Sequence, residues 1–536
     1  MAITVTGLKL PLTAEESSLL QRAARALRIR EADIQGLRLV RTSLDARKKS
    51  DIFFSCTAEL RLGPALEKKL LGKGLPGVAA ALPEAAPCWP RGARPLDAPI
   101  AVVGLGPAGL FAAYALARQG YKPLVLERGK PIGARAALVE RFFSGGPLDP
   151  NCNVMFGEGG AGAFSDGKLT TRIKDPWAHE VLRVLAAHGA PPEIQIQAKP
   201  HIGTDCLTRV VEALRGDIQA HGGAVYFDTA LVGLETRAGA LTGLRLSGPG
   251  GEINQNVSAC ILAAGQGARD TYKMLHAAGL ELQAKPFAVG VRVEHPRAFI
   301  DASQYGAFAG HPRLGAAEYR LTGRWGARGV YTFCMCPGGL VVASSSDAGQ
   351  VVTNGMSYSA RDGENSNAAV VVQVDGRDFG GEGPLAGLEF QQRLEEAAFR
   401  LGGGGFAAPA QRMCDFLSGQ GPTGFGGVPP TYRPGVANRA VAACLPEAVA
   451  AGIRAGIGQF AARLRGFDMG DAVLTAVESR TSAPVRVLRD GSGQATRLRG
   501  LYPVGEGAGY AGGIVSAAVD GMRAAERVMA IYQPLR

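Results

Sequence analysis

The chain has 536 residues, of which 46% are hydrophobic and 20% charged, and its formal net charge at pH 7 is +11. This length and composition exclude a disordered chain and leave room for two or three domains. The N-terminus lacks the pattern of a secretory signal and no stretch approaches about 18 uninterrupted apolar residues, so we predict neither secretion nor a membrane span. Nine scattered cysteines without a Cys-x-x-Cys motif favour the reducing cytoplasm.

Residues 1–82 are predicted to form a small basic α+β module. We expect strands at 3–10, 37–42 and 52–60, a helix from 13 to 27 that opens on the capping box Thr13-Ala-Glu-Glu16, and a second helix at 66–71. This order suggests a ferredoxin-like fold. Residues 1–98 hold 16 basic and 10 acidic residues. A basic surface of this kind can bind nucleic acid, acidic lipid or an acidic protein partner, and the alternative is a solvated surface without a partner. Residues 83–98, rich in Pro and Ala, are the predicted linker.

A glycine-rich turn follows the first buried strand after this linker. We expect a parallel strand at 100–103, a helix at 107–119 and a second strand at 122–126. The turn is Gly104-Leu-Gly106-Pro107-Ala108-Gly109, whose glycines allow the tight turn, the approach of a pyrophosphate and close helix–strand packing. Glu127 can accept hydrogen bonds from ribose hydroxyls and repels a 2′-phosphate, so this site, with Arg128 beside it, suits FAD or NAD rather than NADP.

Two further signatures select FAD. A helix at 203–220, a strand at 225–235 and a meander through 241–246 and 253–261 lead to Ala264-Gly265, which resembles the strand end of the glutathione-reductase-type fold. In that fold the third signature, here Gly505-Glu506, brings an acid to the ribityl chain, and the helix at 514–531 begins at the pyrophosphate. From these two signatures we predict the cofactor residues Ala264, Gly265, Gly505, Glu506, Gly512, Gly513 and Ile514. Gly159, Gly160 and Gly162 are also predicted to lie around the pyrophosphate or the flavin ring, because repeated glycines allow close approach of the backbone.

These positions predict an α/β protein with a discontinuous FAD-binding domain at 99–280 and 475–536. The substrate domain is predicted at 281–474, with helices near 384–402 and 445–465. A second Gly-x-Gly-x-x-Gly with its own strand and acid is missing from the sequence. If NAD(P)H reduces the flavin, we therefore expect it to bind transiently in the substrate cleft.

Longer strings outside the signatures include 156–169, 331–339 and 353–365, with others at 43–49, 286–296, 478–482 and 505–513. Together they resemble one family, the bacterial and plastid "NAD(FAD)-utilizing" FAD-dependent dehydrogenases. The resemblance spans nearly the whole chain and implies an FAD-dependent oxidoreductase. Where that family usually has Gly-His-Ser-Ala-Arg-Asp, this chain has Gly265-Gln266-Gly267-Ala-Arg-Asp270, so no catalytic residue is assigned there.

The candidate catalytic residues each have a structural alternative. Lys168 either stabilises negative charge on reduced flavin or pairs with Asp166. Arg292, Glu294 and His295 have the composition of a substrate clamp with a proton donor. Strand alternation puts Arg292 and Glu294 on one face and His295 on the other, which favours an ion pair with a surface histidine.

Four other residues carry open alternatives. Arg361 lies in a polar, glycine-bent loop that either contacts substrate or only turns the chain. Arg480 falls where the chain re-enters the FAD-binding domain, a place that usually borders the isoalloxazine. Cys334 and Cys336 share a strand face and form either a thiol pair or two small buried hydrophobes. Two ligands are too few for a zinc site, so no metal is predicted.

The sequence therefore predicts an FAD-dependent oxidoreductase that transfers a hydride between flavin N5 and an unidentified small molecule. One alternative is a flavoenzyme that acts on RNA, anchored by Arg38, Arg41, Arg47, Lys48 and Lys49. Another is a non-catalytic flavin-binding protein whose N-terminal module docks a protein partner.

Overall fold

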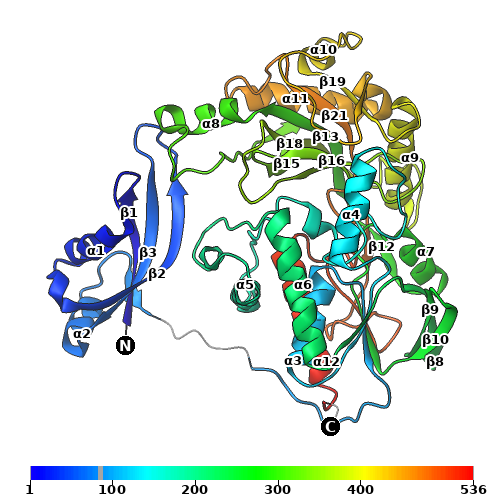
Figure 1. Ribbon diagram of the computed structural model, residues 1–536, viewed down its shortest axis with the longest axis horizontal. Helices are drawn as coiled ribbons and strands as arrows, with labels where there is room; N and C mark the ends of the chain where they lie inside the picture. Colours follow the sequence, from blue (N-terminus) through cyan, green and yellow to red (C-terminus); the bar gives the residue numbers. More distant parts are fainter. Residues whose placement is uncertain (1, 82–87, 535–536) are drawn as a thin grey trace.

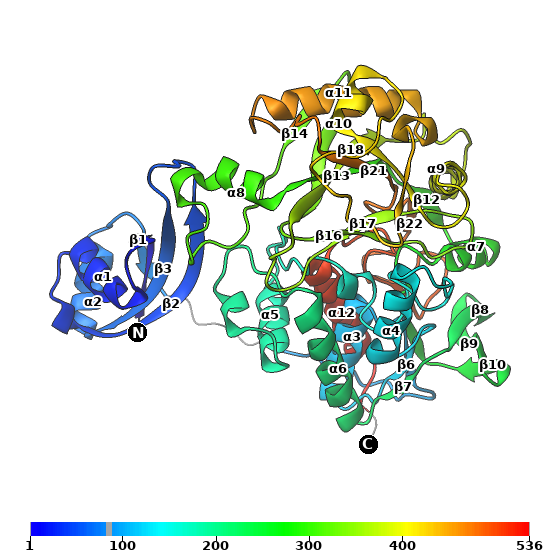
Figure 2. The ribbon, with the colours of Figure 1, turned by 45° about the horizontal axis from the view of Figure 1, so that its top comes forward.

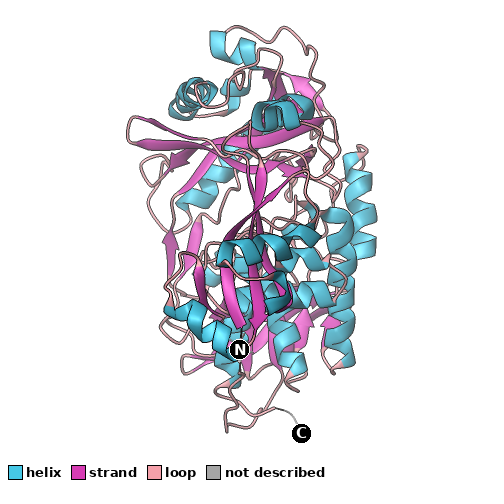
Figure 3. Ribbon diagram, turned by 90° about the vertical axis from the view of Figure 1, so that its left-hand side faces the viewer, coloured by secondary structure: helices cyan, strands magenta, loops and turns pink. Residues whose placement is uncertain are grey.

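The computed structural model describes residues 2–81 and 88–534. Figure 1 shows an N-terminal sheet at one side of the molecule and two larger layered parts, one above the other. Figure 3 shows the strands of these two parts from the side, with helices around them. Among the described residues, no helix is long and apolar enough to cross a membrane. The architecture is the mixed α/β class that the sequence predicts.

The N-terminal sheet has the predicted ferredoxin-like arrangement. It is four-stranded, with the order β2-β3-β1-β4 and antiparallel pairing between neighbours. In chain order its elements are β1 (Ala2–Pro11), α1 (Leu19–Leu27), β2 (Ile34–Asp45), β3 (Phe53–Leu62), α2 (Pro64–Gly72) and β4 (Val78–Ala80). The predicted helix start at Thr13 is wrong. The Ala14 N–H donates to the Pro11 carbonyl in a turn, and a short 3-10 helix at Glu16–Ser18 precedes α1.

The five-stranded parallel sheet carries glycine signatures at the ends of its strands. Its order is β23-β11-β5-β6-β7, with β5 (Ile100–Val103), β6 (Leu124–Leu126), β7 (Ala224–Tyr226), β11 (Ala259–Leu262) and β23 (Leu501–Pro503). Ile100 and Val102 share a core with α3 (Pro107–Arg118), α6 (Thr204–Ala220) and α12 (Ile514–Met529). Ala101 and Val103 belong to the core on the opposite face, beside α7 (Arg269–Ala277). Burial on both faces explains why this strand is apolar throughout.

Two segments that the sequence presents as single strands are each split between two sheets. The segment 225–235 is β7 and β8 (Ala230–Arg237), and 253–261 is β10 (Gly251–Asn256) and β11. β8, β9 (Ala240–Gly248) and β10 form a separate three-stranded antiparallel sheet. Asp228, between β7 and β8, has a φ of +52°. This left-handed conformation turns the chain out of the parallel sheet, and apolar patterning does not reveal it.

The seven-stranded sheet has the order β14-β15-β18-β13-β21-β19-β20. Its strands are β13 (Phe287–Pro296), β14 (Thr322–Trp325), β15 (Arg328–Cys336), β18 (Asn365–Val374), β19 (Ala408–Arg412), β20 (Val436–Asn438) and β21 (Val473–Glu478). The two helices predicted in this region are α9 (Ala386–Leu401) and α11 (Glu447–Ala461). α11 packs on the outer face of the sheet, while α3 and α12 lie on its other side (Figure 2).

The domain boundary predicted at residue 475 falls inside β21. The division of the chain into an FAD-binding domain and a substrate domain stays a prediction.

Short pairings join these parts. β12 (Leu282–Ala284) and β22 (Val485–Val487) pair side by side where the chain passes between the two large sheets. The N-terminal sheet is tied to the rest by the Thr42 N–H, which donates to the Ile196 carbonyl at 2.7 Å.

Residues 83–87 of the predicted linker lie outside the described residues. After them, the rings of Trp89 and Trp177 lie 4.1 Å apart between centroids. Other elements of the structure include α4 (Ile132–Phe143), α8 (Arg297–Tyr305), α10 (Met413–Ser418), β16 (Leu340–Ala343) and β17 (Thr353–Met356).

Candidate functional site

Glycine-rich loops converge at the carboxyl end of β5. Gly104 has a φ of +92°, a conformation that favours glycine. A Cβ built on Gly109 would lie 3.0 Å from the Gly104 carbonyl carbon and 3.3 Å from the Ala263 Cβ, so the packing of α3 requires glycine here. A Cβ on Gly160 would lie 2.9 Å from the Gly106 Cα. The first signature is therefore packed directly against the loop at 159–162.

Two helices begin at this junction. α3 starts with Pro107 and Ala108, and α12 starts with Ile514 after Gly512 and Gly513. A Cβ on Gly162 would lie 3.1 Å from the Ile514 Cγ1 and 3.7 Å from the Pro107 Cγ, so both helix starts border the same glycine. Because the free N–H groups at a helix start attract anions, two such starts side by side suit a pyrophosphate.

The second and third signatures close the cradle and leave room beside it. A Cβ on Gly505 would lie 2.9 Å from the Ala108 Cβ, and one on Gly507 would lie 2.7 Å from the Gly265 backbone. A Cβ on Gly265, Gly512 or Gly513 would meet no atom of the described residues within 4 Å. Some glycines thus bring the loops together and others face open space. This combination fits FAD.

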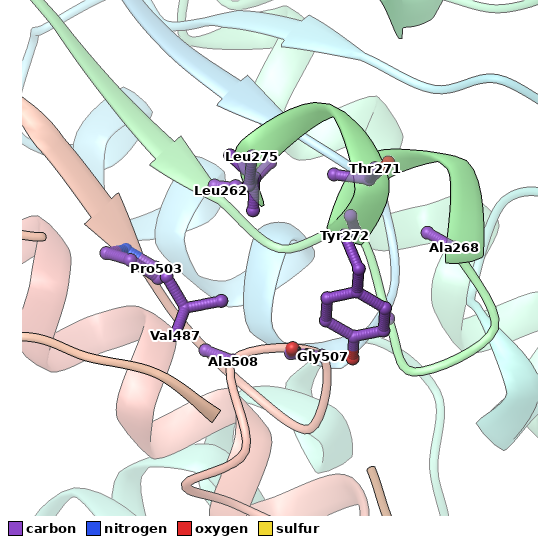
Figure 4. Close-up of a pocket in the computed structure, with 11 residues that line it drawn as sticks. Leu262, Ala268, Thr271, Tyr272, Leu275, Val487, Pro503, Gly507 and Ala508 are labelled. Carbon is purple, nitrogen blue, oxygen red and sulfur yellow. Dashed lines mark hydrogen bonds between the residues drawn. The ribbon is translucent and has the colours of Figure 1, made fainter. Parts of the chain in front are cut away.

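A small apolar cavity lies behind the loop that contains Gly265. Figure 4 shows its lining, which includes Leu262 from β11, Tyr272 and Leu275 from α7, and Val487 from β22. The Tyr272 hydroxyl donates to the Gly507 carbonyl at 2.7 Å. The cavity therefore marks the packing behind the second and third signatures, and α7 fixes their relative position.

Glu127 has a different set of partners from those predicted. The carboxylate is buried and accepts from the backbone N–H of Leu105 at 2.7 Å, Gly129 at 2.9 Å and Gly157 at 3.1 Å. A carboxylate offers about four acceptor positions, so about one remains for a ribose hydroxyl. Glu127 joins the first glycine loop to the loop at 157, and its ribose contact stays a prediction.

Arg128 and Glu506 border the same region. Arg128 pairs with Asp270 at 2.8 Å, and its guanidinium lies 4.5 Å from the centroid of the Phe156 ring. Burial raises the pKa of the Glu506 carboxyl to about 7, and the positive charge of Lys285 opposes this rise. Ala264 and Gly265 follow β11, as the second signature predicts. The individual cofactor contacts of these residues stay predictions.

Arg135 on α4 is a positioning residue that sequence reasoning missed. Its guanidinium is fully buried and donates to the carbonyls of Asn153 at 2.9 Å, Val154 at 2.9 Å, Gly157 at 3.2 Å and Glu158 at 2.5 Å. Burial lowers the pKa of Arg135 to about 10. The side chain therefore holds the loop that leads into 159–162. Its only sequence signal is an arginine on the apolar face of a helix.

Arg292 lies on the inner face of the seven-stranded sheet, and its donors are already engaged. Nε and Nη2 donate to the Glu478 carboxylate at 2.9 and 3.0 Å, and Nη2 also donates to the Asn354 Oδ1 at 2.9 Å. Nη1 donates to the Cys334 carbonyl at 2.8 Å and to the Asn367 Oδ1 at 2.9 Å. A guanidinium has five N–H donors, and these bonds use all of them. The geometry favours the structural ion pair over the substrate clamp.

His295 points to the opposite face, as strand alternation predicts, but the surface position expected for it is wrong. It is fully buried, its Nε2 lies 2.7 Å from the Phe467 carbonyl, and its ring lies between Phe299 and Phe467. Burial lowers the pKa of His295 to about 4. Glu294 stays on the Arg292 face and accepts from the Thr431 hydroxyl at 2.5 Å. A catalytic role for His295 finds no support in this core position.

Lys168 and Arg361 share a buried carboxylate. Lys168 Nζ lies 2.7 Å from the Asp166 Oδ2 and also donates to the Met335 carbonyl on β15. Arg361 donates to both oxygens of Asp166 and to Glu318 Oε1 at 3.1 Å. Burial alone would lower the pKa of Lys168, but the charge of Asp166 raises it above its usual value. The cofactor loop and the inner sheet face are therefore joined through these cations.

Arg480 belongs to a second buried charge network. Its guanidinium pairs with Glu395 on α9 at 2.8 Å, and Arg269 on α7 pairs with the same carboxylate at 2.8 Å. Burial alone would raise the pKa of Glu395, but the two arginines lower it to about 2. Gln266, which replaces the family's histidine, donates to the Arg480 carbonyl at 3.1 Å. Arg480 thus links α9 to the second signature, and its contact with flavin stays a prediction.

The inner face of the seven-stranded sheet also borders a cavity of about 220 Å³. Ala288 and Arg292 lie on this face of β13 because they are an even number of residues apart. Tyr331 and Phe333 on β15 are paired with residues of β18 that face the same way. The cavity is lined by Pro286, Phe287, Ala288, Tyr331, Phe333, Gln373, Thr481 and Ser482. Phe333 keeps 37% of its surface exposed.

A parallel sheet with a glycine cradle, two helix starts and an opposing antiparallel sheet defines the class of FAD-dependent oxidoreductases with a two-dinucleotide-binding fold. The family described as "FAD-dependent protein, C-terminal domain-like" matches residues 286–481, and "NAD(P)-binding Rossmann-like domain" matches 102–161. A domain of unknown function matches residues 2–61. FAD is the cofactor of the protein.

An uncharacterised protein of Clostridium beijerinckii is 44% identical over 533 residues, which cover 99% of each chain. The chain belongs to the same family as that protein, a family of FAD-dependent oxidoreductases.

Two solved structures are more distantly similar. A geranylgeranyl bacteriochlorophyll reductase-like protein of Thermoplasma acidophilum is 12% identical, with 81% of this chain and 78% of that chain covered and a TM-score of 0.35. Glycine oxidase from Geobacillus kaustophilus is 13% identical, with 83% and 97% covered and a TM-score of 0.32.

Proposed function

We propose that the protein is an FAD-dependent dehydrogenase or reductase that transfers a hydride between flavin N5 and a small or medium-sized organic substrate. Bound FAD supplies the redox chemistry. The observation that carries this proposal is the contact of the cofactor loops with the inner face of the seven-stranded sheet. Lys168, beyond the glycine loop, donates to Met335 on β15, and Gln266, beside Gly265, donates to the Arg480 carbonyl. A substrate in the cavity beside Phe333 would lie on the same face of this sheet.

Lys168 and Arg361 are the cations that we propose to orient the substrate. The bonds described above engage two of the three donors of Lys168 and three of the five donors of Arg361. Arg292, in contrast, has all five donors engaged. The aromatic rings of Tyr331 and Phe333 supply apolar contact area on the same face.

For the reductant we propose NADH or NADPH that binds transiently in the same cleft. We also propose that the chain belongs to the NAD(FAD)-utilizing dehydrogenases, because sequence strings throughout the chain resemble that family. The scattered placement and odd number of the nine cysteines support the reducing cytoplasm as the proposed compartment.

An anaerobic titration of the purified protein with NADH and with NADPH tests this function. Loss of the flavin absorbance at about 450 nm is expected with one of them. We expect Lys168→Met to slow this reduction, while Lys199→Met, which removes an exposed lysine paired with Glu318 at 3.5 Å, serves as the matched control. If dithionite bleaches the flavin and neither nicotinamide does, the proposed reductase half-reaction is wrong.

The structure weakens the RNA alternative. Two of the five proposed phosphate contacts are engaged within the N-terminal module, because Arg38 pairs with Glu59 at 2.9 Å and Arg47 pairs with Asp45 at 2.5 Å. Both pairs are exposed and of low energy, so they reduce the local positive charge without abolishing it. Steeply salt-dependent RNA binding that disappears on removal of residues 1–90 would restore this alternative.

A further inference from the structure

Two free cysteines meet at the end of β15 in an unusual backbone geometry. The pairing of β15 with β18 shifts register between Phe333 and Cys336, and Cys334 has a φ of +41°. Left-handed backbone is unfavourable for a residue with a side chain. Cys336 is fully buried, and its sulfur lies 3.4 Å from the Cys334 carbonyl oxygen, whereas Cys334 is half-buried.

This geometry is compatible with a bond between the two sulfurs. In a regular strand, residues i and i+2 lie about 6.6 Å apart, close to the upper limit of the Cα separation in disulfides. The Cys336 sulfur is also held in place, because a Cβ on Gly355 of β17 would lie 2.6 Å from it. The glycine lets β17 approach the Cys336 sulfur closely.

The charges around the pair make the two thiols unequal. A hydrogen bond from the Cys336 thiol lowers the pKa of Cys334, burial opposes this, and the positive charges of Arg292 and Lys168 lower it further. The same contact with Cys334, together with burial, raises the pKa of the Cys336 thiol. The pKa of the Cys334 thiol is thus lowered and that of the Cys336 thiol raised. This is the asymmetry that thiol–disulfide chemistry uses.

The pair also faces the cofactor side of the sheet. The Arg292 Nη1 donates to the Cys334 carbonyl, and Lys168 from the cofactor loop donates to Met335 between the two cysteines. Cys334 is close enough to Glu506, in the third signature, for its charge to raise the pKa of that carboxyl. The neighbouring Phe333 lines the proposed substrate cavity.

We propose that Cys334 and Cys336 form a redox pair that alternates between a Cys334 thiolate beside a Cys336 thiol and an intramolecular disulfide, and that exchanges electrons with bound FAD. In the oxidising direction the bond between Cys334 Sγ and Cys336 Sγ forms and the S–H bond of Cys336 breaks. Bound FAD would accept the two electrons and this proton. In the reverse direction the disulfide would take up two electrons and a proton from the reduced cofactor, so that the Sγ–Sγ bond breaks and the S–H bond of Cys336 forms again, and the exchange balances without another reactant. The pair gives the protein a second two-electron store beside its cofactor.

The first test is chemical and independent of turnover. Full-length holoprotein is treated with oxidised glutathione or with dithiothreitol and digested with trypsin, which releases 329–361, a peptide with these two cysteines and no other. Oxidation is expected to lower the mass of this peptide by about 2 Da and to remove about two titratable thiols. Cys414→Ser, which removes another half-buried cysteine, should leave the result unchanged. The proposal is overturned if both thiols stay free while the exposed Cys88 reacts.

The second test counts electrons. Anaerobic dithionite titration of the oxidised holoprotein is expected to require about four electrons per flavin, and about two in Cys334→Ser and Cys336→Ser. A requirement of about two electrons in the unaltered protein means that no such store exists. If a serine variant loses its flavin, the peptide mass of the unaltered protein still decides. Failure of NAD(P)H to reduce the flavin would refute the proposed reductase function and would leave both thiol results intact.

Discussion

The packing of α3 against the first glycine turn makes Gly109→Ala the most informative single substitution. In an exposed helix this change is expected to stabilise by about 0.5–1 kcal/mol, because alanine has the higher helix propensity. At Gly109 the added Cβ would overlap the Gly104 carbonyl oxygen and lie 3.0 Å from its carbon and 3.3 Å from the Ala263 Cβ. Alanine has no side-chain torsion that could relieve the overlap, so α3 or the turn must move.

Such overpacking costs about 1–3 kcal/mol, which exceeds the gain in propensity. The movement also displaces the start of α3, where the pyrophosphate is expected to bind. We therefore expect a lower melting temperature and a loss of FAD affinity of at least about tenfold, equivalent to about 1.4 kcal/mol. The assays are flavin content per chain after purification, FAD binding to the stripped protein, and thermal unfolding.

Gly133→Ala is the matched control, since Gly133 lies in α4 and a Cβ there would meet no atom of the described residues within 4 Å. It should keep its flavin and unfold at an equal or slightly higher temperature. If Gly109→Ala keeps full FAD affinity and thermal stability, the tight-turn explanation of this motif is refuted.

Three further substitutions test the buried polar groups. Arg135→Met should cost about 3–5 kcal/mol in denaturant unfolding and weaken FAD binding, because it removes a buried cation that holds four carbonyls. Glu395→Gln should also destabilise, because it leaves Arg269 and Arg480 without a carboxylate. The pKa of Glu395 is lowered to about 2 from a usual 4.5, so its stabilisation is complete above pH 4.5 and declines as the pH falls towards 2, a slope that the variant should lack. The pKa of His295 is lowered to about 4 from 6.5, so protonation of this buried imidazole disfavours the folded state. Its contribution to the free energy of unfolding is fully present above pH 6.5 and is lost as the pH falls towards 4, by about 3 kcal/mol at most. His295→Phe should remove this step in melting temperature and leave flavin reduction unchanged; a large loss of flavin reduction would instead support the catalytic prediction.

Strong local patterns predicted their elements well. The strand at 100–103 and the start of α3 at Pro107 agree with the structure, because an apolar run followed by a glycine turn and a proline at the helix start acts within a few residues. Weak local patterns failed. The segments 225–235 and 253–261 were expected as single strands, although each supplies two sheets, because strand pairing depends on distant partners.

The candidate site divides in the same way. The glycine loops, the FAD class and the opposite directions of Arg292 and His295 can be predicted from the sequence, because each depends on spacing along a short segment. The contacts of these side chains depend instead on tertiary packing. Arg292 is engaged by Glu478, 186 residues away, and by Asn354, 62 residues away, and His295 is buried against Phe467, 172 residues away. Partners this far apart leave no local pattern, because chain folding and side-chain packing alone bring them within hydrogen-bond distance.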